Sequence, residues 1–119
     1  MRISLNIGID YAGGIYRDCV VSLLTIGGEC QAQEAIAEMA LPDENRTLSQ
    51  ERLVDLAYLA QQVEIVGIPV EVNAAFLFEH LTDEDYWQLI EATLQLRKKR
   101  LQNGENQEQA NPNQTVETA

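Results

Sequence analysis

The sequence is short of basic residues: it holds 8 lysines and arginines against 19 aspartates and glutamates, a formal net charge of −11. A protein that binds nucleic acid by displacing phosphate counterions needs lysines and arginines gathered on one face. The one such cluster, residues 97–100, closes an expected helix, where solvated basic side chains are ordinary. The composition therefore argues against nucleic-acid binding, and we expect the acidic surface to keep the chain soluble.

Long apolar runs are missing too. No stretch approaches the roughly 18 apolar residues of a membrane-spanning helix, and the start, MRISLNIGID, has neither the apolar run nor the cleavage site of a signal peptide. The two cysteines, Cys19 and Cys30, form no CxxC pair and have no histidine near them in sequence. We therefore expect no membrane partner, a protein that stays in the cytoplasm where it is made, and two buried, reduced thiols.

Motifs that carry catalysis are absent as well. The sequence has no glycine-rich phosphate loop and no GxSxG, HExxH or EF-hand pattern. The single histidine, His80, has no neighbouring ligands in sequence, and consecutive acidic residues such as Asp83, Glu84 and Asp85 point around a helix instead of at one cation. The sequence thus predicts no catalytic, metal-binding or cofactor-binding residue and no enzyme, although spacing leaves open a site assembled in three dimensions.

The N-terminal part of the chain has the pattern of a β-hairpin. Residues 2–10 alternate strictly, and the apolar side chains that share one face are Ile3, Leu5, Ile7 and Ile9. Such alternation predicts a half-buried strand. Residues 11–14 tolerate positive φ, and residues 15–24 are rich in β-branched and aromatic side chains, so a second strand should pair with the first.

Helices should follow the hairpin. Residues 29–40 have good helix formers and an acidic first turn. Thr47 and Gln50 fit a capping box for a second helix, and Ser49 is the competing cap. Its apolar residues recur at spacings of three and four up to Val66, and Gly67 suits the left-handed position after a helix end.

Two further helices are marked by their ends. Asn73 can cap a short helix that runs through Leu81. Thr82 can cap a last helix, whose first turn is acidic and whose last turn holds the basic residues 97–100. Both ends of that helix therefore complement its macrodipole.

The length of 119 residues and the apolar content of 45% allow one domain with one modest core. Residues 102–119 are dominated by asparagine, glutamine and glutamate, with Val116 as their one large apolar residue. They cannot repay their ordering entropy. We expect an α+β domain over residues 1–101, a hairpin followed by about four helices, and a disordered polar tail over residues 102–119.

Four aromatic residues of the last third are candidate partner-binding residues: Phe76, Phe78, Tyr86 and Trp87. Phe76 and Phe78 cannot both face one side of a helix, so one of each pair can stay exposed and form a contact surface. In the alternative, helices pack on both sides and bury all four. Exposed aromatic side chains on helices would suit an amphipathic helix as partner.

The sequence resembles the tail assembly chaperones of Mu-like contractile-tailed bacteriophages, the family that includes the E proteins of related myophages. Residues 16–29, YRDCVVSLLTIGGE, resemble that family's hairpin strand and turn. Residues 53–100 are similar to its order of a helix over Ala-x-Leu-Ala-x-x-Val, a Gly-Ile-Pro break, a short helix and a final helix ending in basic residues. The resemblance covers residues 3–101 and departs from the family's pattern at Cys19 and Ser22, where an aromatic and a basic residue are typical.

Members of that family are cytoplasmic factors that bind the tape measure protein, a long helical protein that otherwise aggregates, and hand it over as the tail tube polymerises. The resemblance therefore implies a chaperone in the host cell cytoplasm that is not retained in the virion. It further implies the tail tube protein, or a longer form made by programmed ribosomal frameshifting, as possible additional partners.

Two other functions remain open at this point. The chain could be a minor structural component of the finished tail. Alternatively, it could be an acidic mimic of nucleic acid, which would need carboxylates in a row along one face. The sequence spreads its carboxylates instead.

Overall fold

The computed structural model describes residues 1–110 and the side chains of residues 1–104. Within them, three strands and four helices follow one another as β1 (Arg2–Tyr11), β2 (Gly14–Val21), α1 (Ile26–Glu38), α2 (Leu48–Ala60), β3 (Val63–Ile65), α3 (Ala74–His80) and α4 (Asp83–Ala110). The strands form one antiparallel sheet in the order β1-β2-β3. The predicted α+β fold, with an N-terminal hairpin followed by helices, is confirmed.

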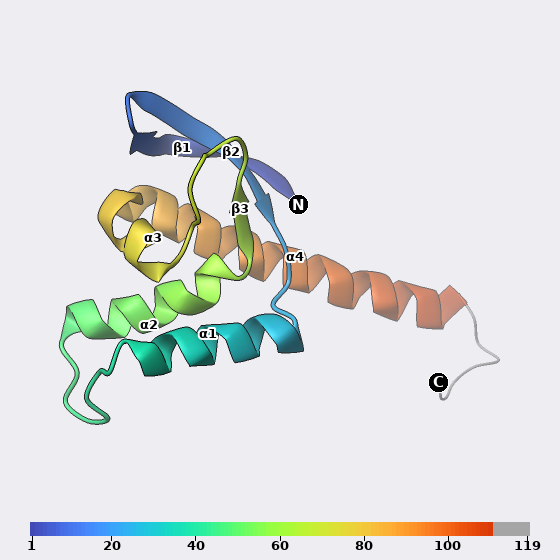
Figure 1. Ribbon diagram of the computed structural model, residues 1–119. Helices are drawn as coiled ribbons and strands as arrows, with labels where there is room; N and C mark the ends of the chain where they lie inside the picture. Colours follow the sequence, from blue (N-terminus) through green and yellow to red (C-terminus); the bar gives the residue numbers. More distant parts are fainter. Residues whose placement is uncertain (111–119) are drawn as a thin grey trace.

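The longest helix, α4, lies against the sheet (Figure 1). It packs against β1 and β2, whereas α2 contacts α1, α3 and β3. The C-terminal part of α4 extends past the sheet and the other helices (Figure 1). This helix therefore has a packed half and a projecting half.

The hairpin turn is the one that the sequence predicts. Ala12 and Gly13, its two central residues, have φ values of 51° and 85°. Positive φ at both positions is typical of the two-residue turn whose twist matches that of the flanking strands. The second strand ends at Val21, earlier than the predicted residue 24.

The sequence interpretation missed β3 and wrongly extended the second helix to Val66. Val63 and Ile65 are buried and Glu64 is exposed, so this short segment alternates like a strand. Three residues give too few alternations to distinguish a strand from the apolar spacing of a helix, and pairing with β2 decides the outcome. Gly67 has the expected positive φ of 83°, but in the turn after β3 instead of at a helix end.

A bulge interrupts the first strand, and the strict alternation predicted there is wrong. The pairing register with β2 shifts between Ser4 and Ile9. Ile7, expected on the buried face, is 45% exposed. Gly8 has a φ of 94°, and a Cβ atom on it would lie 2.7 Å from Cγ2 of Ile15. Only glycine fits such a site, and extra residues in one strand are typical of a bulge.

The bulge directs two backbone amides at the start of α4. The amides of Ile7 and Gly8 donate to the two carboxylate oxygens of Asp85, at 3.0 and 2.7 Å. Asp85 is fully buried, and its own amide donates to Oγ1 of Thr82, the predicted cap, at 3.2 Å. A buried carboxylate needs such donors, so this contact fixes the start of α4 on β1.

Further hydrogen bonds hold the same junction. The side chain of Gln88 accepts from the amide of Asn6 at 2.9 Å and donates to the carbonyl of Ser4 at 2.8 Å. Arg17 of β2 donates to the carbonyl of Asn6 at 2.8 Å. The backbone groups that the bulge removes from the β-ladder thus find side-chain partners.

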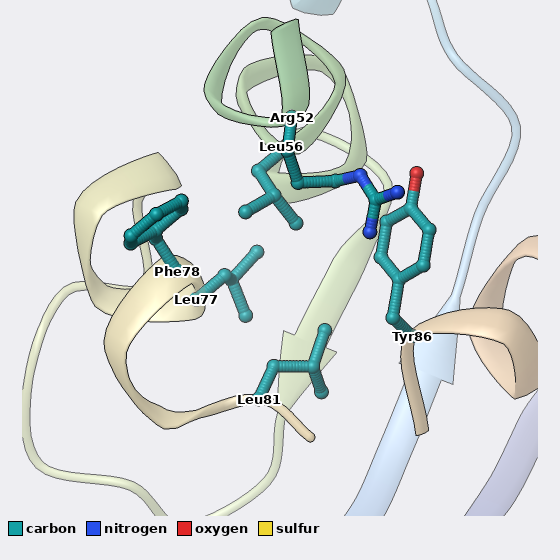
Figure 2. A pocket seen from close by; sticks show the side chains of 6 residues that line it. All are labelled: Arg52, Leu56, Leu77, Phe78, Leu81 and Tyr86. Atoms are coloured by element: carbon teal, nitrogen blue, oxygen red, sulfur yellow. The ribbon is translucent and has the colours of Figure 1, made fainter. Parts of the chain in front are cut away.

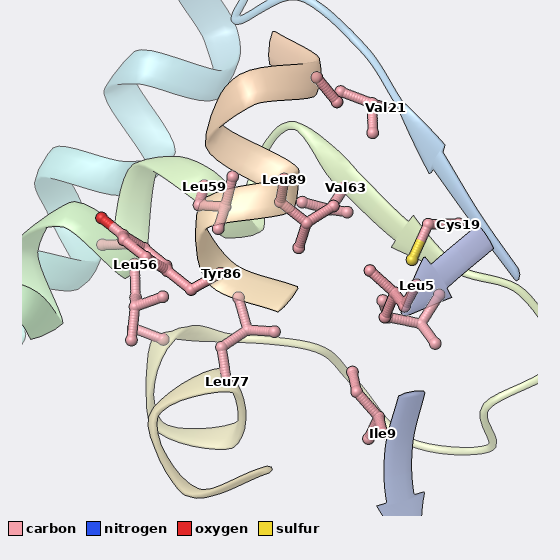
Figure 3. Packing of buried hydrophobic residues seen from close by; sticks show 14 of the residues in the cluster. Leu5, Ile9, Cys19, Val21, Leu56, Leu59, Val63, Leu77, Tyr86 and Leu89 are labelled. Carbon is pink, nitrogen blue, oxygen red and sulfur yellow. The ribbon is translucent and has the colours of Figure 1, made fainter. Parts of the chain in front are cut away.

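The core lies between the sheet, α2, α3 and the packed half of α4 (Figure 3). The sheet contributes Leu5, Ile9, Cys19 and Val21, and the helices contribute Leu56, Leu59, Leu77 and Leu89. Burial raises the pKa of the Cys19 thiol to about 12. Cys30 is exposed on α1, so the prediction of two buried thiols is wrong for this residue.

Two predicted helix starts are confirmed by their hydrogen bonds. Thr47 and Gln50 form the reciprocal capping box of α2, at 3.1 and 3.0 Å. Asn73 accepts from the amide of Phe76 at 2.9 Å and caps α3. Local capping chemistry therefore identified these boundaries.

The first helix begins earlier than the predicted residue 29. Thr25 caps it by accepting from the amide of Gly28 at 3.0 Å. A Cβ atom on Gly28 would lie 3.3 Å from Cβ of Gln61, so this glycine permits the close approach of α1 to the end of α2. Glycine has a low helix propensity, which is why the sequence placed it outside the helix.

The last helix continues past the basic residues 97–100 to Ala110. The tail predicted from residue 102 is therefore helical over residues 102–110. Glutamine and glutamate are good helix formers, so a polar segment can extend a helix that is already nucleated. The remainder of the predicted tail, residues 111–119, lies outside the described residues.

Candidate functional site

The four aromatic residues singled out from the sequence lie in three different environments. Phe76 is half-buried, and Tyr86 is buried. Phe78 and Trp87 are 41% and 53% exposed. One residue of each pair is therefore exposed, as the first of the two alternatives predicts.

Phe76 belongs to an aromatic cluster that joins α3 to the hairpin. Its ring stacks on His80 with 4.5 Å between centroids, and it lies 5.5 Å from the ring of Tyr11. His80 meets Tyr11 edge-on at 5.6 Å. These contacts give Phe76 and His80 a packing role, and neither residue belongs to the candidate surface.

Tyr86 and Trp87 form a second cluster with Arg52 of α2. The two aromatic rings meet edge-on at 4.9 Å. The guanidinium carbon of Arg52 lies 4.5 Å from the ring centroid of Tyr86 and 5.6 Å from that of Trp87. Such cation–π contacts hold Arg52 across the start of α4. Burial, with the carboxylate of Asp55 nearby, raises the pKa of Tyr86, and Arg52 opposes this shift.

A small hollow lies on one side of Tyr86 (Figure 2). Its volume is about 120 Å³, and it is lined by Arg52, Leu56, Leu77, Phe78, Leu81 and Tyr86. An apolar cavity of roughly 150 Å³ accepts a molecule the size of benzene. The hollow therefore has the size and the lining to take one apolar side chain, with Arg52 at its edge.

A larger groove lies on the other side of Tyr86, between α2 and α4. Its volume is about 300 Å³, and it is lined by Asp55, Tyr58, Leu59, Gln62, Tyr86, Ile90 and Thr93. Among the described residues, no Cα atom of α2 lies within 8 Å of one of α4. Only side chains bridge the two helices, which leaves the groove open between them.

An apolar stripe continues from the groove along α4. Its residues recur at spacings of three, four and seven, which places them on one helix face: Trp87, Ile90, Leu94 and Leu101. Leu94 and Leu101 are 59% and 54% exposed, and Ile90 is half-buried. Neighbouring apolar side chains of this kind are typical of contact surfaces, whereas scattered ones are not.

Charges of opposite sign flank the two ends of this surface. Asp55 lines the groove, Glu51 lies one helical turn earlier on α2, and Glu91 follows Ile90 on α4; all three are exposed. The basic residues 97–100 are exposed further along α4. The surface thus has an acidic part at the groove and a basic part beyond it.

The sequence predicted some of the residues of this surface. Phe78, Tyr86 and Trp87 belong to it, but Arg52 and Ile90 were not identified. The spacing of Trp87, Ile90 and Leu94 is visible in the sequence, whereas the packing of Arg52 depends on how α2 lies against α4.

The described residues contain no group of three or more histidine, cysteine, aspartate or glutamate side chains that could hold a metal ion. Nor does any helix in the described part of the chain have the length and apolar character to cross a membrane. What the arrangement offers is a surface for another apolar helix: a hollow for one side chain, a groove and a stripe.

Comparison with known proteins adds no relative. No protein-family model, no curated protein and no solved structure matches the chain.

Proposed function

We propose that the protein is a non-enzymatic tail assembly chaperone of a contractile-tailed bacteriophage, which binds the tape measure protein in the host cytoplasm. It keeps that client soluble until the tail tube assembles and does not remain in the virion. The resemblance over residues 3–101 suggests the family. The observation that carries the proposal is the exposed apolar surface around Tyr86, which consists of the hollow, the groove and the stripe.

The geometry suits an amphipathic client helix. Such a helix presents apolar side chains at positions i, i+3 or i+4 and i+7. One of them enters the hollow beside Phe78, and the next ones lie along the groove against Tyr86 and Ile90. The client's apolar side chains are thereby withdrawn from water, which removes the cause of its aggregation.

The charge of the protein supports the same function. At a net charge of −11, complexes repel one another and stay dispersed. The tail tube protein would release the client by competing for its apolar stripe. Exposed carboxylates are spread over α1, α2 and α4, a distribution that favours a soluble chaperone over a nucleic-acid mimic.

The test is co-expression with a tape measure protein of the same phage, followed by affinity capture and a solubility assay. We expect a soluble complex, with the client aggregating when it is expressed alone. Trp87→Ala combined with Phe78→Ala should reduce the captured client about tenfold or more, because aromatic anchors dominate helix binding.

The matched control is Leu48→Ala, since Leu48 is 86% exposed at the start of α2 and lines neither the hollow nor the groove. It should capture as much client as the parent chain. If the client stays soluble alone and never co-purifies, the proposal is wrong. Stoichiometric copies in purified virions would then identify a structural component of the tail.

A further inference from the structure

The projecting half of α4 is polar and basic, with Leu101 as its one large apolar residue, and the side chains of residues 97–103 are exposed. We name residues 97–110 the arm. Half of the chain's 8 basic residues lie in it, Arg97, Lys98, Lys99 and Arg100, and all four are exposed. Leu101 beside them is 54% exposed. Within residues 1–104, none of the four basic residues belongs to an ion pair.

The groove between α2 and α4 has the complementary character. Its lining is partly apolar and aromatic, with Leu59, Tyr86 and Ile90, and Gln62 and Thr93 also contribute to it. Its α2 wall carries Asp55, and Glu51 lies one helical turn earlier on the same face. The basic side chains of the arm complement this acidic wall, and Leu101 can extend the contact to the apolar stripe beside the groove.

The arm cannot enter the groove of its own chain. It continues the same helix as Tyr86 and Ile90, and it extends away from the body (Figure 1). A continuous α-helix advances about 1.5 Å per residue and does not turn back on itself. The arm is therefore available only to another molecule.

We propose that a second copy of this chain covers the stripe and the edge of the groove, in a dimer in which the arm of each copy lies along the stripe of the other. A two-fold axis at Leu94 makes the two α4 helices antiparallel. Residues that lie equally far from Leu94 in sequence, on opposite sides of it, then face each other, so that Leu101 of the second copy faces Trp87. Lys98 of the second copy faces Ile90, next to Asp55.

In this arrangement each copy covers the exposed apolar stripe of the other and pairs with its charges. The stripe is covered by its own copy, since Leu94 meets Leu94 and Trp87 meets Leu101. Arg97 of the second copy pairs with Glu91, and its neighbours lie along the acidic wall of α2. The contact is self-complementary, as a two-fold interface must be. The dimer covers part of the surface that the proposed function assigns to the client, so a client helix and a second copy exclude each other there, and the mass of the chain alone tests the dimer without a client.

The first experiment measures the mass of the purified full chain by sedimentation, from about 1 µM to about 1 mM, the span of weak to moderate affinities. We expect a concentration-dependent monomer–dimer equilibrium. The single tryptophan, Trp87, should shift its emission to shorter wavelength as the dimer forms, because Leu101 of the second copy covers it. A chain that stays monomeric throughout this range overturns the proposal.

A charge exchange then tests the interface. One variant reverses the acidic partners of the arm, Asp55→Lys with Glu91→Lys, and another reverses the arm, Arg97→Glu with Lys98→Glu. Each variant alone should dimerise about tenfold or more weakly, because both reciprocal contacts become repulsive. An equimolar mixture should form a one-to-one heterodimer, since each reversed arm then meets reversed partners and each original arm meets original ones.

The matched control is Glu34→Lys with Glu38→Lys on α1, which makes the same change of charge at exposed residues that do not line the groove. It should dimerise like the parent chain or more tightly, because it lowers the net repulsion. Circular dichroism establishes that every variant is folded. Dimerisation that persists in both reversed variants, or a mixture that restores no heterodimer, overturns the proposal.

Discussion

The two halves of α4 belong to one helix and differ in what fixes them. In the first half, Asp85, Leu89 and Ala92 are buried, and hydrogen bonds join the helix to the bulge of β1. In the second half, residues 97–103 are exposed. Burial and long-range hydrogen bonds hold the first half in place, whereas helix propensity alone maintains the second.

The two halves of this one helix can therefore have two different roles. The packed half is part of the core and should respond strongly to substitution. The projecting half contributes little to stability, which leaves its side chains free for contacts with other molecules. Pairs of matched substitutions along the chain test this division.

The largest contrast should come from two leucines of α4. Leu89 is fully buried, whereas Leu94 is 59% exposed. Leu89→Ala should lower the free energy of unfolding by about 2–5 kcal/mol, because it leaves a cavity in the core. Leu94→Ala should change it by less than about 0.5 kcal/mol. Urea denaturation of both variants at one low protein concentration measures the difference, and equal losses would show that the face of α4 that carries Leu94 is packed.

The next contrast concerns two aspartates in the first turn. Asp85→Ala removes the acceptor of the Ile7 and Gly8 amides and leaves both without a side-chain partner. The expected loss is about 2–3 kcal/mol. Asp83→Ala removes an exposed carboxylate from the same helix start and should cost only about 0.3–1 kcal/mol. Thermal unfolding of the two variants compares them, and a neutral Asp85→Ala would mean that the bulge does not anchor the helix.

The sequence predicted the parts of this fold that depend on neighbours in the chain. The caps Thr47, Asn73 and Thr82 were identified because their side chains bond to amides three residues on. The hairpin turn was identified for a similar reason. Local hydrogen-bond chemistry can be read from a short window of sequence.

The features that were missed depend on distant partners. The strand β3 forms because it pairs with β2. Ile7 is exposed because its amide donates to the carboxylate of Asp85 in α4. The candidate surface divides in the same way. The stripe can be read from spacing along α4, but the groove and the place of Arg52 depend on the distance between two helices.

Two glycines of the hairpin test whether the bulge is fixed by packing. Gly8 and Gly13 both have positive φ, 94° and 85°. A Cβ atom on Gly8 would collide with Ile15, whereas one on Gly13 would meet nothing within 4 Å. Gly8→Ala should therefore cost about 2 kcal/mol or more, and Gly13→Ala about 1 kcal/mol, the cost of the backbone strain alone. Similar losses in urea denaturation would show that the bulge yields to a methyl group.

The smallest effect should follow removal of residues 102–119. Gln102 and Asn103 are exposed, and the residues of α4 that lie in or against the core, from Tyr86 to Leu96, all precede the deleted segment. The deletion keeps Leu101 and the basic residues 97–100, so both the core and the stripe stay intact. The free energy of unfolding should change by less than about 0.5 kcal/mol, because Val116 is the one large apolar residue in the removed segment. Urea denaturation at a protein concentration below the dimer range measures this without a contribution from self-association. A loss of several kcal/mol would mean that the end of the chain packs on the body, and the two halves of α4 would then no longer differ in what holds them.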